Sequence, residues 1–299
     1  MAFIAFSVYV AIQPNSYKVV KTKTINAPKE VVFEFITNLE NSSQWMNSND
    51  AILTITELNK HKSIQLDKQS PNAPTAKVNW NLEDKEGDKT KFTWDVESTN
   101  LPFMFKAKQV FKGNIDSIIG NKIESSWTKL DSLLKVKMNL HSIKTEGVTQ
   151  HSGGFYIYKE ATCKLSEFTT KKAKLFESLL NYIEQHHIIP SGAPFTIFHQ
   201  RDTENDVVQF SCAIPTSTEL TIENNDISAG YLPAFKTIKT QLSGDYKYLN
   251  AAWKATHNYL TENNLKPTES VFKMESYIKT PHDSKNPADW VTEIFIAVE

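Results

Sequence analysis

The stretch WVTEIFIAV at residues 290–298 decides the fold of the second half of the chain, because VVQFSCAI at residues 207–214 reads as an earlier copy of it. Two more pairs of phrases repeat at a similar distance: FESLLNYIEQHHI from Phe176 with WKATHNYLTENNL from Trp253, and Gly154-Phe155 with Gly230-Tyr231. A self-similarity of nearly fixed spacing across three separate phrases predicts an internal duplication.

Each copy has the hydrophobic pattern of a strand, a helix and two further strands. In the first copy these elements are expected at residues 155–165, 169–187, 195–199 and 207–214. In the second copy they are expected at residues 227–242, 245–263, 271–277 and 291–298.

The second half also carries phrases typical of a known family. Ser243-Gly244-Asp245-Tyr246, Glu275-Ser276-Tyr277 and the closing stretch at 290–298 resemble the gyrase-inhibitor-like (GyrI-like) effector-binding domain over residues 140–299. The resemblance implies a pseudo-two-fold pair of units, a small-molecule pocket on the axis, and an acidic residue in the last strand, here Glu293. Ala297-Val298 stands where the family usually has Pro-Val, which leaves the pocket prediction intact.

Glu293 is a carboxylate inside an otherwise apolar strand, and the earlier copy has a neutral Gln209 in its place. Because burial of an unpaired carboxylate is costly, we expect it to have a partner. Rings around a carboxylate suit a flat organic cation. The alternative is a surface carboxylate on an edge strand. The predicted ligand-binding residues are Glu293, Phe295, Gln209, Tyr231, Trp253 and Tyr277.

The first half predicts a different α+β layout. A strand over residues 17–28 leads through Asn26-Ala27-Pro28 into a short helix. Short strands follow at residues 52–57, 63–67, 76–83, 90–97 and 103–111. Apolar residues at spacings of three and four then predict a long amphipathic helix: Ile115, Ile118, Ile119, Ile123, Trp127, Leu130 and Leu134.

The opening INAPKEVVFEFI at residues 25–36, followed by Trp45 and the terminal helix, resembles the SRPBCC superfamily, also called START-like or polyketide cyclase proteins. The resemblance covers about residues 17–137. It implies a helix-grip domain with a hydrophobic cavity between the sheet and the long helix. The aromatic residues expected to line it are Trp80, Trp94, Phe105 and Trp127, and the alternative is that they are simply core.

The expected fold class is therefore α+β, with a helix-grip domain at 17–137, a polar, Gly-ended linker at 138–147 and a duplicated effector-binding domain at 148–299. Within residues 1–16, the stretch from Ala2 to Ile12 is uncharged and strongly apolar. A helix of these eleven residues is too short to cross a bilayer. We interpret it as the end of a membrane anchor, or alternatively as a first strand or buried helical turn, so a cytoplasmic and a membrane-anchored location both stay open.

Composition and motifs exclude several kinds of chemistry. A formal net charge of −1 and the lack of a helix-turn-helix argue against nucleic-acid binding. His186-His187 is adjacent rather than spaced for chelation, and no catalytic or nucleotide motif is present, so neither a metal nor a cofactor is expected. Lys171-Lys172-Ala173-Lys174 reads as a solvated helix face. Cys163 and Cys212 are expected to be buried free thiols, although a disulfide is not excluded.

Two classes of function fit these patterns. The first is a small-molecule binding protein whose two modules hold hydrophobic ligands or organic cations. The alternative is a hydrolase of strained or electrophilic small molecules, with Glu293 as the general base. The sequence leaves the ligand and the oligomeric state open.

Overall fold

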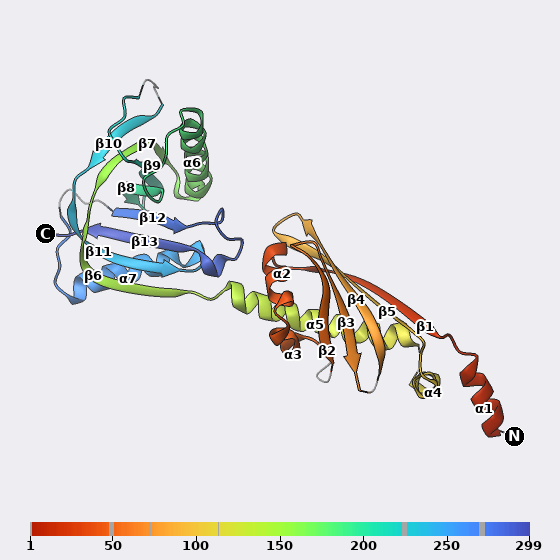
Figure 1. The fold of residues 1–299 in the computed structure, drawn as a ribbon. Coiled ribbons are helices and arrows are strands. Elements are labelled where there is room, and N and C mark those ends of the chain that lie inside the picture. The colour runs from red at the N-terminus through yellow and green to blue at the C-terminus, as the bar shows by residue number, and fades with distance from the viewer. Residues whose placement is uncertain (1, 48–50, 72, 113, 223–225, 269–272) are drawn as a thin grey trace. The chain divides into compact units, whose positions relative to one another are not determined.

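The computed structural model describes residues 2–47, 51–71, 73–112, 114–222, 226–268 and 273–299. The chain divides into two compact units, Met1–Met138 and Asn139–Glu299 (Figure 1). The predicted α+β class is confirmed, because each unit combines one antiparallel sheet with helices.

The N-terminal unit is a five-stranded sheet of order β1-β5-β4-β3-β2 with a long helix, α5, along it, which is the predicted helix-grip layout (Figure 1). Its elements are α1 (Ala2–Ala11), β1 (Ser16–Ile25), α2 (Lys29–Thr37), η1 (Leu39–Asn41), α3 (Ser42–Trp45), β2 (Ile52–Asn59), β3 (Ser63–Ser70), β4 (Ala73–Lys85), β5 (Lys89–Thr99), α4 (Phe103–Lys112) and α5 (Ile115–Met138).

The core of this unit joins α5 to the inward face of the sheet. The ring of Trp127 on α5 lies 5.7 Å from the ring of Phe92 and 6.3 Å from that of Trp94. Burial of a large apolar side chain stabilises a fold by about 1.5–3 kcal/mol. The stripe predicted for the long helix is buried from its third turn onward, at Ile123, Trp127, Leu130 and Leu134.

Residues 103–111, predicted as a strand, form the helix α4 instead. Phe103 and Phe105 are two residues apart, a spacing that is also typical of one face of a strand. The half-buried residues of this segment include the pairs Phe105 and Gln109, and Lys106 and Val110, each four residues apart as on one face of a helix.

The apolar segment at residues 1–16 is mainly helical, since α1 spans Ala2–Ala11 and β1 begins at Ser16. Val10 is buried, whereas Val8 and Tyr9 are exposed. Within the described ranges, no helix is both long and apolar enough to cross a membrane.

The C-terminal unit is an eight-stranded sheet of order β10-β7-β9-β8-β12-β13-β11-β6, which is symmetric about an axis between β8 and β12. This topology confirms the duplication. Its elements are β6 (Ser142–His151), β7 (Gly154–Cys163), η2 (Leu165–Glu167), α6 (Phe168–Gln185), β8 (Phe195–Asp202), β9 (Val207–Thr216), β10 (Ser228–Leu232), β11 (Phe235–Ser243), η3 (Tyr246–Tyr248), α7 (Leu249–Glu262), β12 (Lys273–Lys279), η4 (Pro287–Asp289) and β13 (Val291–Ala297).

The expected linker at residues 138–147 is mostly strand. β6 begins at Ser142 and pairs with β11, so only residues 139–141 separate it from α5. The glycine that suggested a loop end, Gly147, has a φ of +85° and follows Glu146, the residue of β6 that is left over at the register shift against β11. A bulge of this kind favours glycine, so the same residue suits a strand as well as a turn.

The two helices α6 and α7 pack on one face of the C-terminal sheet. Leu179 of α6 contacts the cluster that includes Phe210 of β9, and Ala252 of α7 contacts the cluster that includes Ile294 of β13. A third cluster, on the opposite face, contains Phe195, Ile197, Met274 and Phe295. The central part of the sheet therefore packs against apolar side chains on both of its faces. Cys163 and Cys212 are free thiols.

Candidate ligand-binding site

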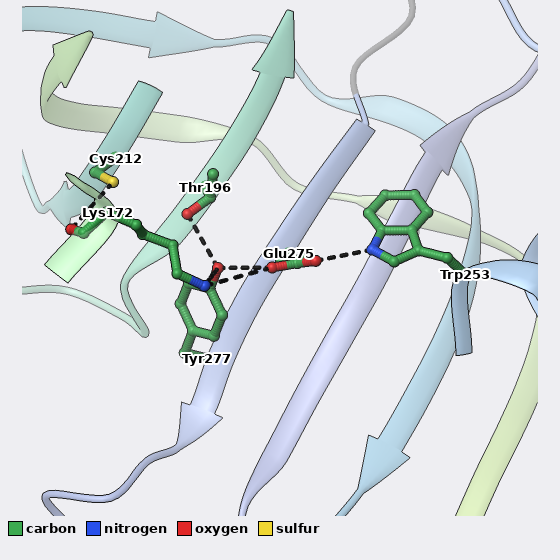
Figure 2. A network of polar contacts seen from close by, with 6 residues as sticks. All are labelled: Lys172, Thr196, Cys212, Trp253, Glu275 and Tyr277. Atoms are coloured by element: carbon green, nitrogen blue, oxygen red, sulfur yellow. Dashed lines mark hydrogen bonds and ion pairs between the residues drawn. The ribbon is translucent and has the colours of Figure 1, made fainter. Parts of the chain in front are cut away.

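The centre of the C-terminal unit holds a buried carboxylate, Glu275 of β12, whose residue is only 3% exposed. The indole Nε1 of Trp253 donates a hydrogen bond of 2.8 Å to Oε1, and the hydroxyl of Tyr277 donates one of 2.7 Å to Oε2 (Figure 2). Because a buried charge is costly unless it is paired, these donors alone leave Glu275 in need of a cation.

Lys172 of α6 supplies that cation. Its Nζ lies 3.9 Å from Oε2 of Glu275 and donates a hydrogen bond of 2.9 Å to the hydroxyl of Tyr277 (Figure 2). Three rings surround the ammonium, with centroids at 4.6 Å for Tyr277, 5.1 Å for Phe168 and 5.8 Å for Tyr246. The arrangement is an aromatic cage with a carboxylate at its base and an ammonium inside it.

The hydroxyl of Tyr277 organises the cage. It donates to Glu275 and accepts from Lys172, so the contact of 3.1 Å with Thr196 is one in which Thr196 donates. Burial, followed by the Glu275 carboxylate, raises the pKa of Tyr277 well above its usual value. Tyr277 therefore stays a neutral donor at physiological pH.

Strand geometry explains how this site assembles. Glu275 and Tyr277 are two residues apart on β12 and so point to the same face, toward the helices. Thr196 of β8 is the cross-strand partner of Glu275, which places both beside the pseudo-two-fold axis. The helices then add Lys172 and Trp253 from opposite copies of the repeat.

A buried thiol completes the surroundings. Cys212 of β9 donates through Sγ to the carbonyl oxygen of Lys172 at 3.8 Å (Figure 2). Burial raises the pKa of the Cys212 thiol to about 12, so it remains protonated and unreactive.

The structure brings together two of the six residues predicted for this pocket, Trp253 and Tyr277. Glu293 pairs with Ser276 across the β12–β13 ladder, so it shares the face of Ser276 and lies opposite Glu275. Phe295 lies on the face of Glu293. The expected grouping of all six residues around one cleft is therefore corrected.

The remaining two predicted residues lie elsewhere. Gln209 is an exposed residue of β9, which is separated from β13 by β8 and β12. Tyr231 is 60% exposed on the edge strand β10 and lies against Phe155. The similarity between the copies indicates equivalent positions, and equivalent positions lie on opposite sides of the axis rather than beside each other.

Glu293 has a partner within the sheet. Its Oε1 lies 2.6 Å from Nζ of Lys239, which is also 3.3 Å from Glu146. The partner expected for this carboxylate is thus a neighbouring lysine of β11.

Glu275 and Lys172 were not among the predicted site residues, although the sequence contains a signal for each. The phrase Glu275-Ser276-Tyr277 places an acid and a phenol on one strand face. Lys172 was predicted to be solvated, but it stands four residues after Phe168 and four before Phe176, in line with the buried side of the helix.

The N-terminal unit contains a cavity of about 350 Å³ between the sheet and helices α4 and α5. Of the four aromatic residues predicted to line it, Trp94 and Phe105 do so. Trp80 and Trp127 are not among its lining residues and are buried in the core, with exposed fractions of 0% and 1%. Close packing around Trp45 and Phe92 accounts for this difference.

Among the residues that the structure describes, no group of three or more His, Cys, Asp or Glu side chains is placed to hold a metal ion.

Comparison with known proteins identifies the C-terminal unit. Residues 137–299 match the model of the GyrI-like small molecule binding domain, and this match covers more than half of the chain. The chain therefore belongs to the GyrI-like family. No curated protein sequence matches it.

Several solved structures are similar at low identity. The C-terminal domain of EcmrR is 17% identical, with 54% of this chain and 98% of that chain covered and a TM-score of 0.43. SAV2435 bound to tetraphenylphosphonium is 11% identical, with 52% and 94% covered and a TM-score of 0.39. A START superfamily protein from Mycobacterium smegmatis is 14% identical, with 40% and 97% covered and a TM-score of 0.32. The SRPBCC membership of the N-terminal unit stays a prediction.

Proposed function

We propose that the C-terminal unit binds small organic cations, and that the charged group of the ligand takes the place of the Lys172 ammonium beside Glu275. The observation that carries this proposal is the cage itself. A buried carboxylate, two neutral donors and three aromatic rings already hold one cation of the chain.

Stability alone does not account for such a cage. Replacing a buried ion pair by well-packed apolar residues is often neutral or stabilising, because desolvation of two charges offsets their attraction. A fold that needed only a core at this place would be served by the aromatic rings. The polar network is better explained by recognition of a charge.

Lys172 can leave the cage without disturbing the sheet. Its ammonium is at the end of a flexible side chain that is 15% exposed, on a helix at the surface of the unit. Departure returns the ammonium to water and leaves Glu275 with Trp253 and Tyr277 as donors. An incoming cation then replaces one ion pair by another.

This exchange favours a particular kind of ligand. An alkylammonium is strongly hydrated, so a ligand of the same kind gains little over Lys172. A quaternary ammonium with an aryl group is less hydrated and brings additional area to Phe168, Tyr246 and Tyr277. We therefore assign aryl-substituted quaternary cations as the ligand class.

The test compares benzyltrimethylammonium with neopentylbenzene, its uncharged isostere, by ligand-observed NMR titration. Both are measured in the Lys172→Met background, so that no lysine of the chain competes for the carboxylate. There Glu275→Gln should lower the affinity for the cation by about thirtyfold or more, because loss of a desolvated charge pair costs about 2–5 kcal/mol. Affinity for the neutral isostere should change far less.

Glu293→Gln is the matched control, since it removes the same charge from the opposite face of the same sheet. It should leave the affinity for benzyltrimethylammonium within about twofold of the wild type. Equal cation affinity of Lys172→Met with and without Glu275→Gln, or a loss confined to Glu293→Gln, would contradict the proposed site. Circular dichroism of both variants shows whether the fold is retained.

A further inference from the structure

The inward face of β3 in the N-terminal unit contains a lysine where an apolar residue is expected. Ile64 and Leu66 point into the core with exposed fractions of 0% and 1%, and Lys68 continues the same alternating row. Lys68 is half-buried and lines the cavity. Burial, followed by the nearby charge of Lys122, lowers the pKa of Lys68.

Two other lysines line the same cavity, Lys122 of α5 and Lys108 of α4. Both are exposed, so they stand at its mouth, whereas Lys68 lies deeper. None of the three ammonium groups forms an ion pair or side-chain hydrogen bond with a residue that the structure describes. Among those residues no aspartate or glutamate lines the cavity. Among the described residues, the cavity wall thus carries three lysines and no acidic side chain.

The rest of the cavity wall is largely apolar. Trp94 and Val78 come from the sheet, Phe105 from α4 and Ile119 from α5. Phe105 stacks on Tyr17 with their ring centroids 6.4 Å apart. The volume of about 350 Å³ lies within the range of small-ligand sites, about 300–1,000 Å³.

We propose that this cavity is a second ligand site and that it takes an amphipathic organic anion, whose acidic group pairs with Lys68 and Lys122 and whose apolar body lies against Trp94 and Phe105. The two units then select ligands of opposite charge. This inference is independent of the cation site, because it concerns a different unit and a different kind of probe.

The test uses two fluorescent probes that differ in one group. 8-Anilinonaphthalene-1-sulfonate carries a sulfonate, and N-phenyl-1-naphthylamine is the same molecule without it. Both are titrated into the full-length protein, so that the difference between their affinities reports the contribution of the anionic group.

Lys68→Met and Lys122→Met remove a charge and keep an unbranched side chain. Each should lower the affinity for the sulfonate about tenfold or more and leave the affinity for the uncharged probe within about twofold. Lys62→Met is the control, since Lys62 is exposed just before β3 and does not line the cavity. It should change neither affinity.

Phe105→Ala should weaken both probes together, which locates them in the cavity. Lys68→Met relieves a half-buried charge, so its thermal unfolding temperature should not fall. The proposal is overturned if the sulfonate binds Lys68→Met and Lys122→Met as tightly as wild type, if both lysine variants weaken the two probes equally, or if Phe105→Ala leaves both affinities unchanged.

Discussion

The ammonium of Lys172 lies 4.6 Å from the centre of the Tyr277 ring and donates a hydrogen bond of 2.9 Å to the hydroxyl of the same residue. One tyrosine thus offers both its π face and an acceptor to a cation of the chain. Because that cation is covalently attached, a ligand that prefers the same place competes against an intramolecular group.

Lys172→Met should therefore raise the affinity for benzyltrimethylammonium, by about tenfold or more. The ligand binds only those molecules in which Lys172 has left the cage. If they are a minor fraction, the apparent affinity is reduced by that fraction, and Lys172→Met removes the reduction. Calorimetric or NMR titration measures the change.

Lys171→Met, one position earlier on α6, is the matched control, because Lys171 is exposed and loses the same charge. The affinity of Lys171→Met for benzyltrimethylammonium should equal that of wild type. A decrease of cation affinity in Lys172→Met would show that Lys172 supports the ligand rather than competing with it.

Tyr277→Phe should lower the free energy of unfolding of the C-terminal unit by about 1–3 kcal/mol, since it removes a donor from Glu275 and an acceptor from Lys172 inside the fold. Hydrogen exchange of the β12 backbone in the full-length protein measures the change locally.

Tyr231→Phe provides the comparison for this tyrosine. Tyr231 is 60% exposed on β10, and removal of its hydroxyl should change stability by less than about 0.5 kcal/mol. Similar effects of the two substitutions would mean that the Tyr277 hydroxyl contributes nothing beyond an ordinary surface group.

The fold could be predicted from the sequence, whereas the grouping of the site residues could not. The duplication and the hydrophobic periods are local patterns, and they determine which segments form strands and helices. Which face of the sheet a residue occupies depends on register. The cross-strand neighbour of Glu293 is Ser276 and not Glu275. A register shift of one residue would turn Glu293 to the opposite face of the sheet, where Trp253 of α7 bonds to Glu275.

The N-terminal unit shows the same limit. The sequence predicts that Trp80, Trp94 and Trp127 lie between the sheet and the helix, and they do. Whether a ring lines a cavity or fills the core depends on the volume left after all neighbours are packed. The ring centroid of Trp80 lies 5.4 Å from that of Trp45 and 5.3 Å from that of Trp94. Because Trp80 is enclosed by these rings, it belongs to the core, whereas Trp94 lines the cavity.

His151 should make the stability of the C-terminal unit depend on pH. It stacks on Phe235, and its Nδ1 accepts a hydrogen bond of 3.0 Å from the backbone N–H of Gly153, which requires the neutral ring. Burial lowers the pKa of His151, and the charge of Glu293 partly offsets this.

The sign of the effect follows from proton linkage. The unfolded chain has a histidine pKa of about 6.5 and binds the proton more readily than the folded state, so stability is lost as pH falls through that value toward the lower folded pKa. Glu293→Gln should lower the folded pKa of His151 further, as measured by NMR titration of the imidazole. A higher pKa in this variant would contradict the assigned role of Glu293.

A fragment that begins at Asn139 should fold without the N-terminal unit, and a fragment that begins at Val148 should be less stable. The chain divides at Met138, and the residues that follow are held by the C-terminal unit: the ring of His141 stacks on Tyr248 at 3.5 Å, and Nζ of Lys247 donates to Asn139. The segment 142–147, first expected to be linker, is paired with β11.

Truncation at Val148 leaves the backbone of β11 from Lys239 to Ser243 without its β6 partner. It also removes Ile143 from its place against the cluster that contains Leu242. A loss of about 2 kcal/mol corresponds to about 4–8 °C in Tm for a unit of this size, so the shorter fragment should melt at least about 4 °C lower. Thermal melts of both fragments by circular dichroism make the comparison. Equal melting temperatures would show that residues 142–147 behave as a linker after all, and an unfolded 139–299 fragment would show that the C-terminal unit depends on the rest of the chain.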